Sequence, residues 1–185
     1  MVPIEAFFGI LVVMFTVIGI IRGFLRELGV TLGMTFVLFI LNLFDSQLTV
    51  GLDKVFTVSA KVLPLPNQAV MSCWLYMVVI SALAFTLYHG QTLAFPGDAP
   101  KGMSGVYLGG LVGALNGYLI AGSIWNYMHK YQYACSFFFF DKGLTNLGQS
   151  LIEFLPLNLL GQPVLFGQSL LLYLATALLL ARVIH

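Results

Sequence analysis

Charged residues are scarce in this chain. Of its 185 residues, 8% are Asp, Glu, Lys or Arg, whereas 59% are hydrophobic. A soluble domain carries charge on about a quarter of its residues, so this chain lacks the polar surface that water requires. The composition predicts an integral membrane protein, whose solvent is the lipid bilayer. With a formal net charge of +1, the chain also lacks the basic excess that holds nucleic acid by its phosphates.

Cysteine is nearly absent as well. The chain has Cys73 and Cys135 and no C-x-x-C pattern. The favoured interpretation is a pair of buried free thiols that pack as small hydrophobic groups. A disulfide between them stays open as an alternative, because both residues fall near the same membrane face. The redox compartment is therefore undecided at this stage.

Catalytic signatures are missing from the sequence. It contains no G-x-S-x-G, H-E-x-x-H, P-loop or Rossmann glycine fingerprint, and its seven carboxylates are scattered over both predicted membrane sides. We therefore predict a protein that is not an enzyme and has no metal site. A transporter needs polar groups along a path through the membrane. The few deep polar candidates are Asn42, Ser81, Thr86 and Asn116, which argues against a transporter that acts alone.

Long apolar runs make up most of the sequence. The candidate membrane spans cover residues 3–21, 24–44, 69–88, 104–128 and 164–184. About 20 helical residues, at about 1.5 Å each, match the roughly 30 Å of hydrocarbon in a bilayer. The first run lacks the basic segment of a signal peptide, so we expect it to be retained.

The fold class predicted is all-α, a polytopic membrane protein with four to five transmembrane helices and one interfacial amphipathic helix. Residues 1–128 form a four-span membrane domain, residues 129–163 an interfacial connector and residues 164–185 a fifth transmembrane helix. The polar residues near position 168 also allow a shallow or tilted helix in place of the fifth span.

The amphipathic helix is predicted over residues 48–63. Its apolar side carries Leu48, Leu52, Val55, Phe56, Val62 and Leu63, and its polar side carries Asp53, Lys54, Thr57 and Lys61. This two-sided pattern at helical spacing is typical of a helix lying in the membrane interface. Pro64 and Pro66 would end it, and an ordinary connecting loop is the alternative.

A charged turn separates the first two spans. Arg22, Arg26 and Glu27 stand between long apolar runs. An arginine at the bilayer centre costs about 2.5–3.5 kcal/mol on insertion scales, so we place these charges at the membrane surface. There the arginines extend to water, and Glu27 lies near a helix N-terminus, which favours an anion. We expect the three side chains to contact a partner protein or lipid headgroups.

Small residues recur at helical spacing in the fourth span. Gly105, Gly109, Gly113, Gly117 and Ala121 form one strip, and Gly29 with Gly33 makes a shorter version in the second span. Such strips let helices approach closely in lipid. We predict that spans two and four pack on each other or on a partner's helix, and both an internal and an intermolecular contact remain open. Asn116, in the same span, needs a hydrogen-bond partner there.

Isolated histidines offer weak candidates for a cofactor site. His89 ends the third span and His129 ends the fourth, on opposite faces. Neutral imidazole is a good axial ligand for haem or a chlorophyll-type pigment. An ordinary interface residue is the favoured interpretation of both, and the cofactor content is unknown.

The basic residues do not decide the orientation by number. With five spans, Arg22, Arg26, Lys101 and Arg182 fall on one side, and Lys54, Lys61, Lys130 and Lys142 fall on the other. The short loop with two arginines favours its own side as the cytoplasmic one.

Two segments of the sequence carry a family resemblance. "IGIIRGFLRELGVTLG" (residues 18–33) resembles the N-terminal signature of the colicin V production protein (CvpA) family of bacterial inner-membrane proteins. "GVYLGGLVGALNGYLIAG" (residues 105–122) is similar to the family's glycine-rich fourth span. The resemblance covers residues 4–128. The family often has an acidic–basic pair before that span and an arginine within it, where this chain reads "KGMSG" and has Asn116.

The resemblance implies a multi-pass protein of the bacterial inner membrane, linked to colicin V export and envelope maintenance. We expect a scaffold or assembly factor whose partners are membrane lipids and other membrane-protein subunits or further copies of itself. The alternative is an accessory subunit of a larger respiratory or photosynthetic complex, packed through its glycine-rich helix and in contact with pigment or lipid.

Overall fold

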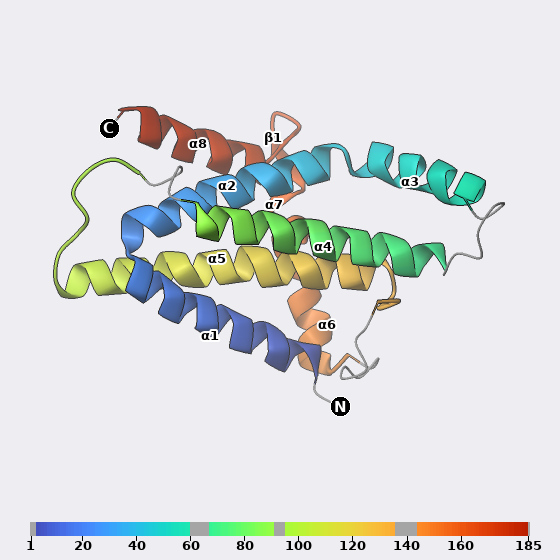
Figure 1. Ribbon diagram of the computed structural model, residues 1–185, viewed down its shortest axis with the longest axis horizontal. Helices are drawn as coiled ribbons and strands as arrows, with labels where there is room; N and C mark the ends of the chain where they lie inside the picture. The colour runs from blue at the N-terminus through green and yellow to red at the C-terminus, as the bar shows by residue number, and fades with distance from the viewer. Residues whose placement is uncertain (1–2, 60–66, 91–94, 136–143, 185) are drawn as a thin grey trace.

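The protein is an all-α polytopic membrane protein, as predicted. The computed structural model describes residues 3–59, 67–90, 95–135 and 144–184. Within these ranges, four helices are long and apolar enough to cross a membrane. They are α1 (Ile4–Arg22), α2 (Phe24–Leu43), α4 (Gln68–His89) and α5 (Met103–Lys130). They lie side by side along the long axis of the molecule (Figure 1).

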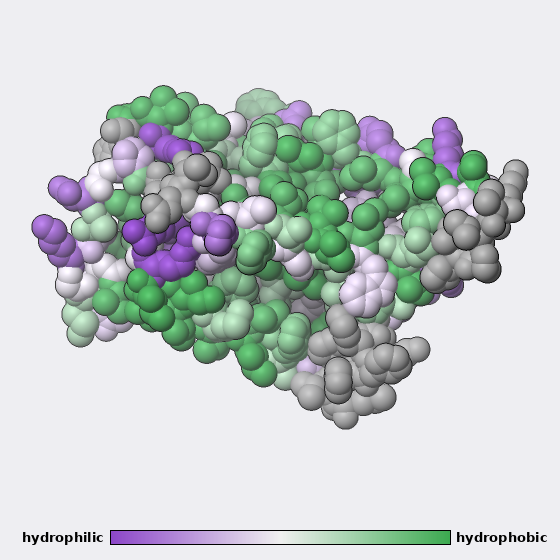
Figure 2. Space-filling view, in the orientation of Figure 1, coloured by the Kyte–Doolittle hydropathy of each residue, from purple (hydrophilic) through white to green (hydrophobic). Residues whose placement is uncertain are grey.

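The two ends of the bundle are defined by contacts between helices. At one end, here called the Arg22 end, the turn between α1 and α2 meets the C-terminus of α4 through a hydrogen bond from Arg22 to Tyr88. At the other, the Lys130 end, Lys130 at the C-terminus of α5 pairs with Asp45, just after α2. Hydrophobic residues cover the middle of the molecule and many hydrophilic residues gather toward its ends (Figure 2), as expected for a protein that crosses a bilayer.

The glycine strip of α5 packs against α1. A Cβ atom at Gly113 would lie 2.5 Å from the carbonyl oxygen of Phe15, and one at Gly109 would lie 2.7 Å from that of Gly19. Backbone therefore meets backbone along this contact, which is possible only because these positions have no side chain. The helix opposite the strip is the first span, whereas the sequence predicted the second span or a partner's helix there; α2 also contacts α5, through the hydrogen bond of Asn116 to Glu27.

The hydrophobic core lies between α2, α4 and α5. Met34, Leu38, Ile80 and Leu119 are fully buried there. By contrast, α1 buries only Ile4 and Gly19, so most of its apolar side chains are on the outside of the bundle. In a bilayer this face meets lipid chains or another protein without the penalty that water would impose.

Helix α3 (Asp45–Ser59) confirms the predicted helix over its described part, although it begins earlier. Residues 60–63 of that prediction lie outside the described residues. The helix runs on in roughly the direction of α2 beyond the Lys130 end (Figure 1) and has no buried residue. A hydrogen bond from Gln68 to Asp53 ties it to the start of α4. It therefore extends the bundle along its long axis, whereas the sequence predicted a helix lying in the membrane interface.

Short elements follow α5 near the Lys130 end. They are α6 (Asn146–Glu153) and α7 (Pro156–Leu160). Glu5 of α1 accepts hydrogen bonds from the backbone N–H and the hydroxyl of Thr145, at 3.2 and 2.8 Å, and so holds the start of α6. Pro156 packs on Gly122 of α5.

The last apolar run is not one continuous helix. Strands β1 (Pro163–Leu165) and β2 (Gln168–Ser169) form a small antiparallel hairpin, with Gly167 at φ +74° in its turn. Only α8 (Leu170–Ile184) is helical, and its 15 residues reach about 22 Å at about 1.5 Å per residue. The predicted fifth transmembrane helix is therefore corrected to a shorter helix packed along α2.

Cys73 and Cys135 form a disulfide, with their Cα atoms 5.8 Å apart. The bond joins the start of α4 to the segment just after α5, at the Lys130 end. The expectation of two free thiols is thus corrected, and the alternative holds.

Candidate functional site

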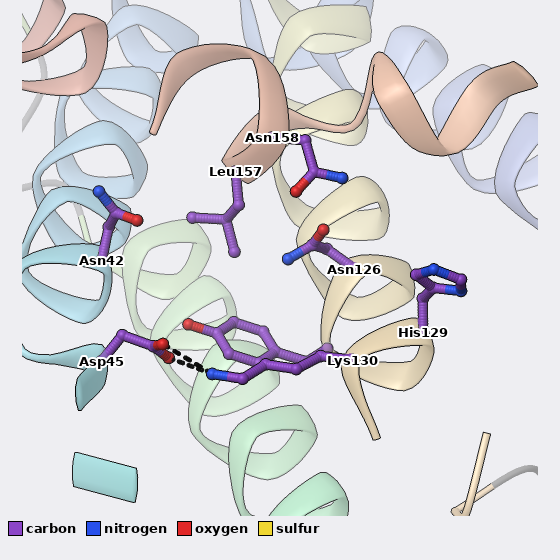
Figure 3. A pocket seen from close by; sticks show the side chains of 8 residues that line it. Asn42, Asp45, Asn126, His129, Lys130, Leu157 and Asn158 are labelled. Carbon is purple, nitrogen blue, oxygen red and sulfur yellow. Dashed lines mark hydrogen bonds and ion pairs between the residues drawn. The ribbon is translucent and has the colours of Figure 1, made fainter. Parts of the chain in front are cut away.

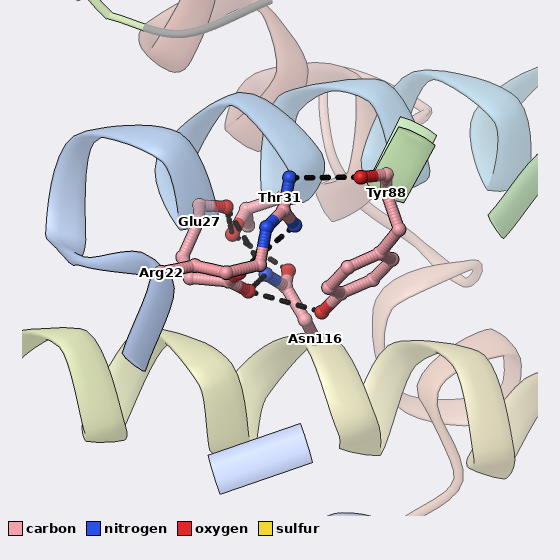
Figure 4. A network of polar contacts seen from close by, with 5 residues as sticks. All are labelled: Arg22, Glu27, Thr31, Tyr88 and Asn116. Carbon is pink, nitrogen blue, oxygen red and sulfur yellow. Dashed lines mark hydrogen bonds and ion pairs between the residues drawn. The ribbon is translucent and has the colours of Figure 1, made fainter. Parts of the chain in front are cut away.

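The charged turn is built by one glycine between two helices. Gly23 has φ +88° and ψ 157°, a conformation that side-chain-bearing residues rarely adopt. It reverses the chain within a single residue, so that Arg22 at the end of α1 lies back over the first turn of α2. Arg22 Nη1 then donates a hydrogen bond to Glu27 Oε1 at 3.1 Å (Figure 4).

The Glu27 carboxylate is the centre of a buried polar network. Its exposed fraction is 0%, whereas that of the Arg22 side chain is 21%. Oε1 accepts the hydrogen bond from Arg22. The other carboxylate oxygen, Oε2, accepts hydrogen bonds from the Tyr88 hydroxyl at 3.0 Å and from Asn116 Nδ2 at 2.7 Å. A buried carboxylate is costly unless it is paired and hydrogen-bonded, and these donors meet that requirement.

Asn116 connects α5 to α2 through every part of its amide. Nδ2 also donates to the backbone oxygen of Glu27 at 3.0 Å. The Thr31 hydroxyl lies 2.8 Å from Asn116 Oδ1 and 3.0 Å from the same Glu27 backbone oxygen, within hydrogen-bond reach of both. Thr31 and Asn116 are both buried, so each side chain meets the hydrogen-bonding need of the other inside the bundle.

Tyr88 brings α4 into the network. Its carbonyl oxygen accepts from Arg22 Nη2 at 3.0 Å, and the guanidinium carbon lies 4.6 Å from the centre of its ring. The arginine thus makes a hydrogen bond, an ion pair and a cation–π contact at once. Figure 4 shows the five side chains converging from α1, α2, α4 and α5.

This arrangement favours a structural role over chemistry. Both Glu27 carboxylate oxygens and both described Asn116 amide atoms are bonded within the chain. The hydroxyls of Thr31 and Tyr88 are likewise hydrogen-bonded within the network, and the closed set of bonds ties all four spanning helices to one another.

The three charged residues of the turn, predicted to contact a partner or lipid headgroups, differ in their exposure. Arg26 is exposed, and Arg22 is partly exposed. Glu27 faces the inside of the bundle, so its predicted contact with a partner or with headgroups is corrected to an internal ion pair. Glu27, Arg22 and Asn116 were all singled out from the sequence, but not as one cluster.

Sequence reasoning missed two members of the network. Thr31 lies one helical turn after Glu27, on the same face of α2, and that spacing was an available signal. Tyr88 resembles any aromatic residue at a membrane interface, so nothing in the sequence distinguished it.

The other small residues of the predicted packing set have internal neighbours. Gly117 faces Phe15 and Val12 of α1, and Gly105 faces the backbone of Pro100. Gly33 faces Leu87 of α4. Gly29 and Ala121 are buried.

The two candidate cofactor histidines lie far apart, at opposite ends of the bundle, and both are exposed. His89 stacks on Phe85, with ring centres 5.6 Å apart. His129 Nδ1 lies 3.3 Å from the Tyr133 hydroxyl. Within the described ranges, no three His, Cys, Asp or Glu side chains group as metal ligands.

Comparison of the chain with protein-family models, curated proteins and solved structures finds no match.

Proposed function

We propose that the protein is a non-enzymatic scaffold or assembly protein of the bacterial envelope, similar to the CvpA family and embedded in the inner membrane in several passes. The observation that carries this proposal is the closed network around Glu27. Its charged and amide groups are bonded within the chain, so they tie the spanning helices together, as a scaffold requires.

The departure from the family pattern fits this interpretation. Asn116 stands where CvpA-like proteins often have an arginine. In this chain Glu27 already has Arg22 as its positive partner, and a second buried cation would lack a counter-charge. An amide at position 116 instead completes the hydrogen bonding of the carboxylate without adding charge.

A scaffold acts through its outer surface. Arg26 extends from the first turn of α2 at the Arg22 end and is exposed. It is the part of the predicted contact set that a partner protein or lipid headgroups can reach. The lipid-facing side of α1 offers an apolar surface beside it.

That surface also supports the alternative of an accessory subunit in a larger respiratory or photosynthetic complex. Ile10, Val13, Val17 and Ile21 of α1 are exposed, and a helix with so little internal packing is suited to the rim of a larger assembly. His89 would then be the first residue to test for pigment contact.

The test is extraction from the native membrane in mild detergent, followed by particle mass, absorption spectrum and mass spectrometry of co-migrating chains. A small colourless particle supports the scaffold, and a large particle with redox or photosynthetic subunits supports the alternative. Arg26→Gln should weaken partner recovery, with Lys101→Gln at the same end as the matched control. Catalytic turnover or transport by the purified chain alone would overturn both.

A further inference from the structure

A second polar cluster lies at the Lys130 end, away from the Glu27 network. A cavity of about 340 Å³ opens there between the C-terminal ends of α2 and α5 and helix α7. Its polar lining includes Asn42, Asp45, Asn126, His129, Lys130 and Asn158 (Figure 3). The volume falls within the range of about 300–1,000 Å³ that is usual for small-molecule sites.

The cavity lies at the depth of lipid headgroups. Asp45 follows Gly23, at the opposite surface turn, by about 22 residues of nearly continuous helix, which corresponds to about 33 Å. This is close to the roughly 30 Å thickness of the hydrocarbon region.

The lining presents one fixed charge of each sign. Lys130 Nζ lies 2.6 and 2.7 Å from the two carboxylate oxygens of Asp45, and the side chains are 33% and 38% exposed. The ammonium also lies about 6 Å from the ring centres of Tyr76, Tyr127 and Tyr131. The pair is therefore held in place, yet both partners remain accessible.

The lining also has hydrogen-bonding capacity that the fold does not use. An ammonium has three N–H donors and a carboxylate has about four acceptor positions, so the single Lys130–Asp45 pair leaves some of each. Asn126 has no hydrogen bond within the described part of the chain, and its amide points into the cavity (Figure 3). Asn158 uses only its N–H₂ group, on Ile152, at 2.8 Å.

We propose that this cavity binds a phosphate ester that bears a primary ammonium, the headgroup of phosphatidylethanolamine. The phosphate accepts hydrogen bonds from Lys130 and from the Asn126 amide. The ammonium donates to the Asp45 carboxylate and to the Asn158 side-chain oxygen. A zwitterion fits because the lining has no net charge, whereas a purely anionic headgroup would leave Asp45 without a second cation.

Exposed leucines follow two of the lining residues in the chain. Leu43 and Leu159, the chain neighbours of Asn42 and Asn158, are exposed. They offer contact for acyl chains, which a soluble phosphate ester does not have.

The experiment is native mass spectrometry of the delipidated full-length protein supplied separately with dioleoyl phosphatidylethanolamine, phosphatidylcholine or phosphatidylglycerol. We expect phosphatidylethanolamine to bind best, because the choline nitrogen has no N–H to donate and the glycerol headgroup has no cation. Asp45→Asn should reduce phosphatidylethanolamine binding about tenfold, the loss of one charge-assisted hydrogen bond. The same change should leave phosphatidylglycerol binding equal or stronger, because it removes the negative charge that opposes an anionic headgroup.

Asn126→Ala provides a variant that does not disturb the fold, because this side chain has no internal partner. It should lower phosphatidylethanolamine binding about fivefold, the weaker loss of one hydrogen bond, with an unchanged melting temperature. Gln149→Ala, on the exposed side of α6, is the matched control and should have no effect.

Soluble phosphoethanolamine tests whether the cavity binds a lipid headgroup or a soluble phosphate ester of the same chemistry. Retention of the lipid in the presence of the soluble compound assigns the site to a headgroup. Binding of the soluble compound alone, with the same dependence on Asp45 and Asn126, assigns it to a soluble ester. Equal binding of all three lipids by wild type and variants, or no binding of any probe, would overturn the proposal.

Discussion

Asn116 donates a hydrogen bond of 2.7 Å to Glu27, from a helix that lies 89 residues further along the chain. The two residues are fully buried, and their contact joins the glycine-rich helix to the charged turn. The stability of the bundle should therefore depend on a few polar atoms near its Arg22 end.

Asn116→Ala should destabilise the protein. It removes a donor from a buried carboxylate, a loss of about 1.5–3 kcal/mol for a hydrogen bond to a charged group. Thermal unfolding in detergent, followed by circular dichroism, measures the change. Asn126→Ala on the same helix is the control and should melt like the wild type; equal melting temperatures for both variants would contradict the role of the network.

The two arginines of the turn should differ in their effect on stability. Arg22→Gln leaves the buried Glu27 carboxylate without its cation. Because Arg22 is itself partly exposed, we expect a loss of about 1.5–3 kcal/mol, the value for a hydrogen bond to a charged group. Arg26→Gln removes an exposed charge and should change the free energy of unfolding by less than about 0.5 kcal/mol. Denaturant titration of both variants compares them directly, and a reversed order would show that the ion pair is not structural.

Gly113→Ala should force α1 and α5 apart. The added methyl group would lie 2.5 Å from the Phe15 carbonyl oxygen, and backbone atoms cannot move aside as a side chain can. Gly9→Ala, where nothing lies within 4 Å, is the control and should be neutral or stabilising, since alanine favours helix by about 1 kcal/mol. The readout is resistance to proteolysis in detergent; similar digestion of both variants would argue against the contact.

Reduction of the Cys73–Cys135 bond should loosen the Lys130 end. A disulfide typically contributes about 2–4 kcal/mol, and this one closes a loop with a sequence separation of 62. Cys73→Ser and Cys135→Ser should each lower the melting temperature, and dithiothreitol should lower that of the wild type alone. Full maleimide labelling of the non-reduced protein would show that the thiols are free.

The sequence predicts the spans because apolar length is a property of each segment by itself. The boundaries of α2 and α5 follow from it closely, as does the surface turn at Gly23. The internal position of Glu27 could not be predicted in the same way, because it depends on Tyr88 and Asn116 reaching the carboxylate from other helices. A charge between two spans has the same local pattern whether it faces water or the bundle.

The glycine strip likewise combines a local feature that the sequence predicts with a partner helix that it does not predict. Spacing predicts that α5 has a face for close packing, but every apolar helix is an equally good partner by pattern, so the choice of α1 depends on the whole arrangement. The last apolar run misled for another reason. Its continuous hydropathy gives no sign of the β1–β2 hairpin, whose turn uses Gly167 at positive φ. Composition does not predict a backbone conformation of this kind.

The disulfide indicates how the bundle is oriented in the membrane. Such bonds persist in oxidising compartments and are rare in reducing ones, and Cys73–Cys135 lies at the Lys130 end. That end, with the projecting α3, is therefore expected to face an oxidising compartment. Arg22 and Arg26 would then lie on the opposite side, the one that the short arginine-containing loop favours as cytoplasmic. An impermeant amine label applied to intact cells should modify Lys54 and spare Lys101.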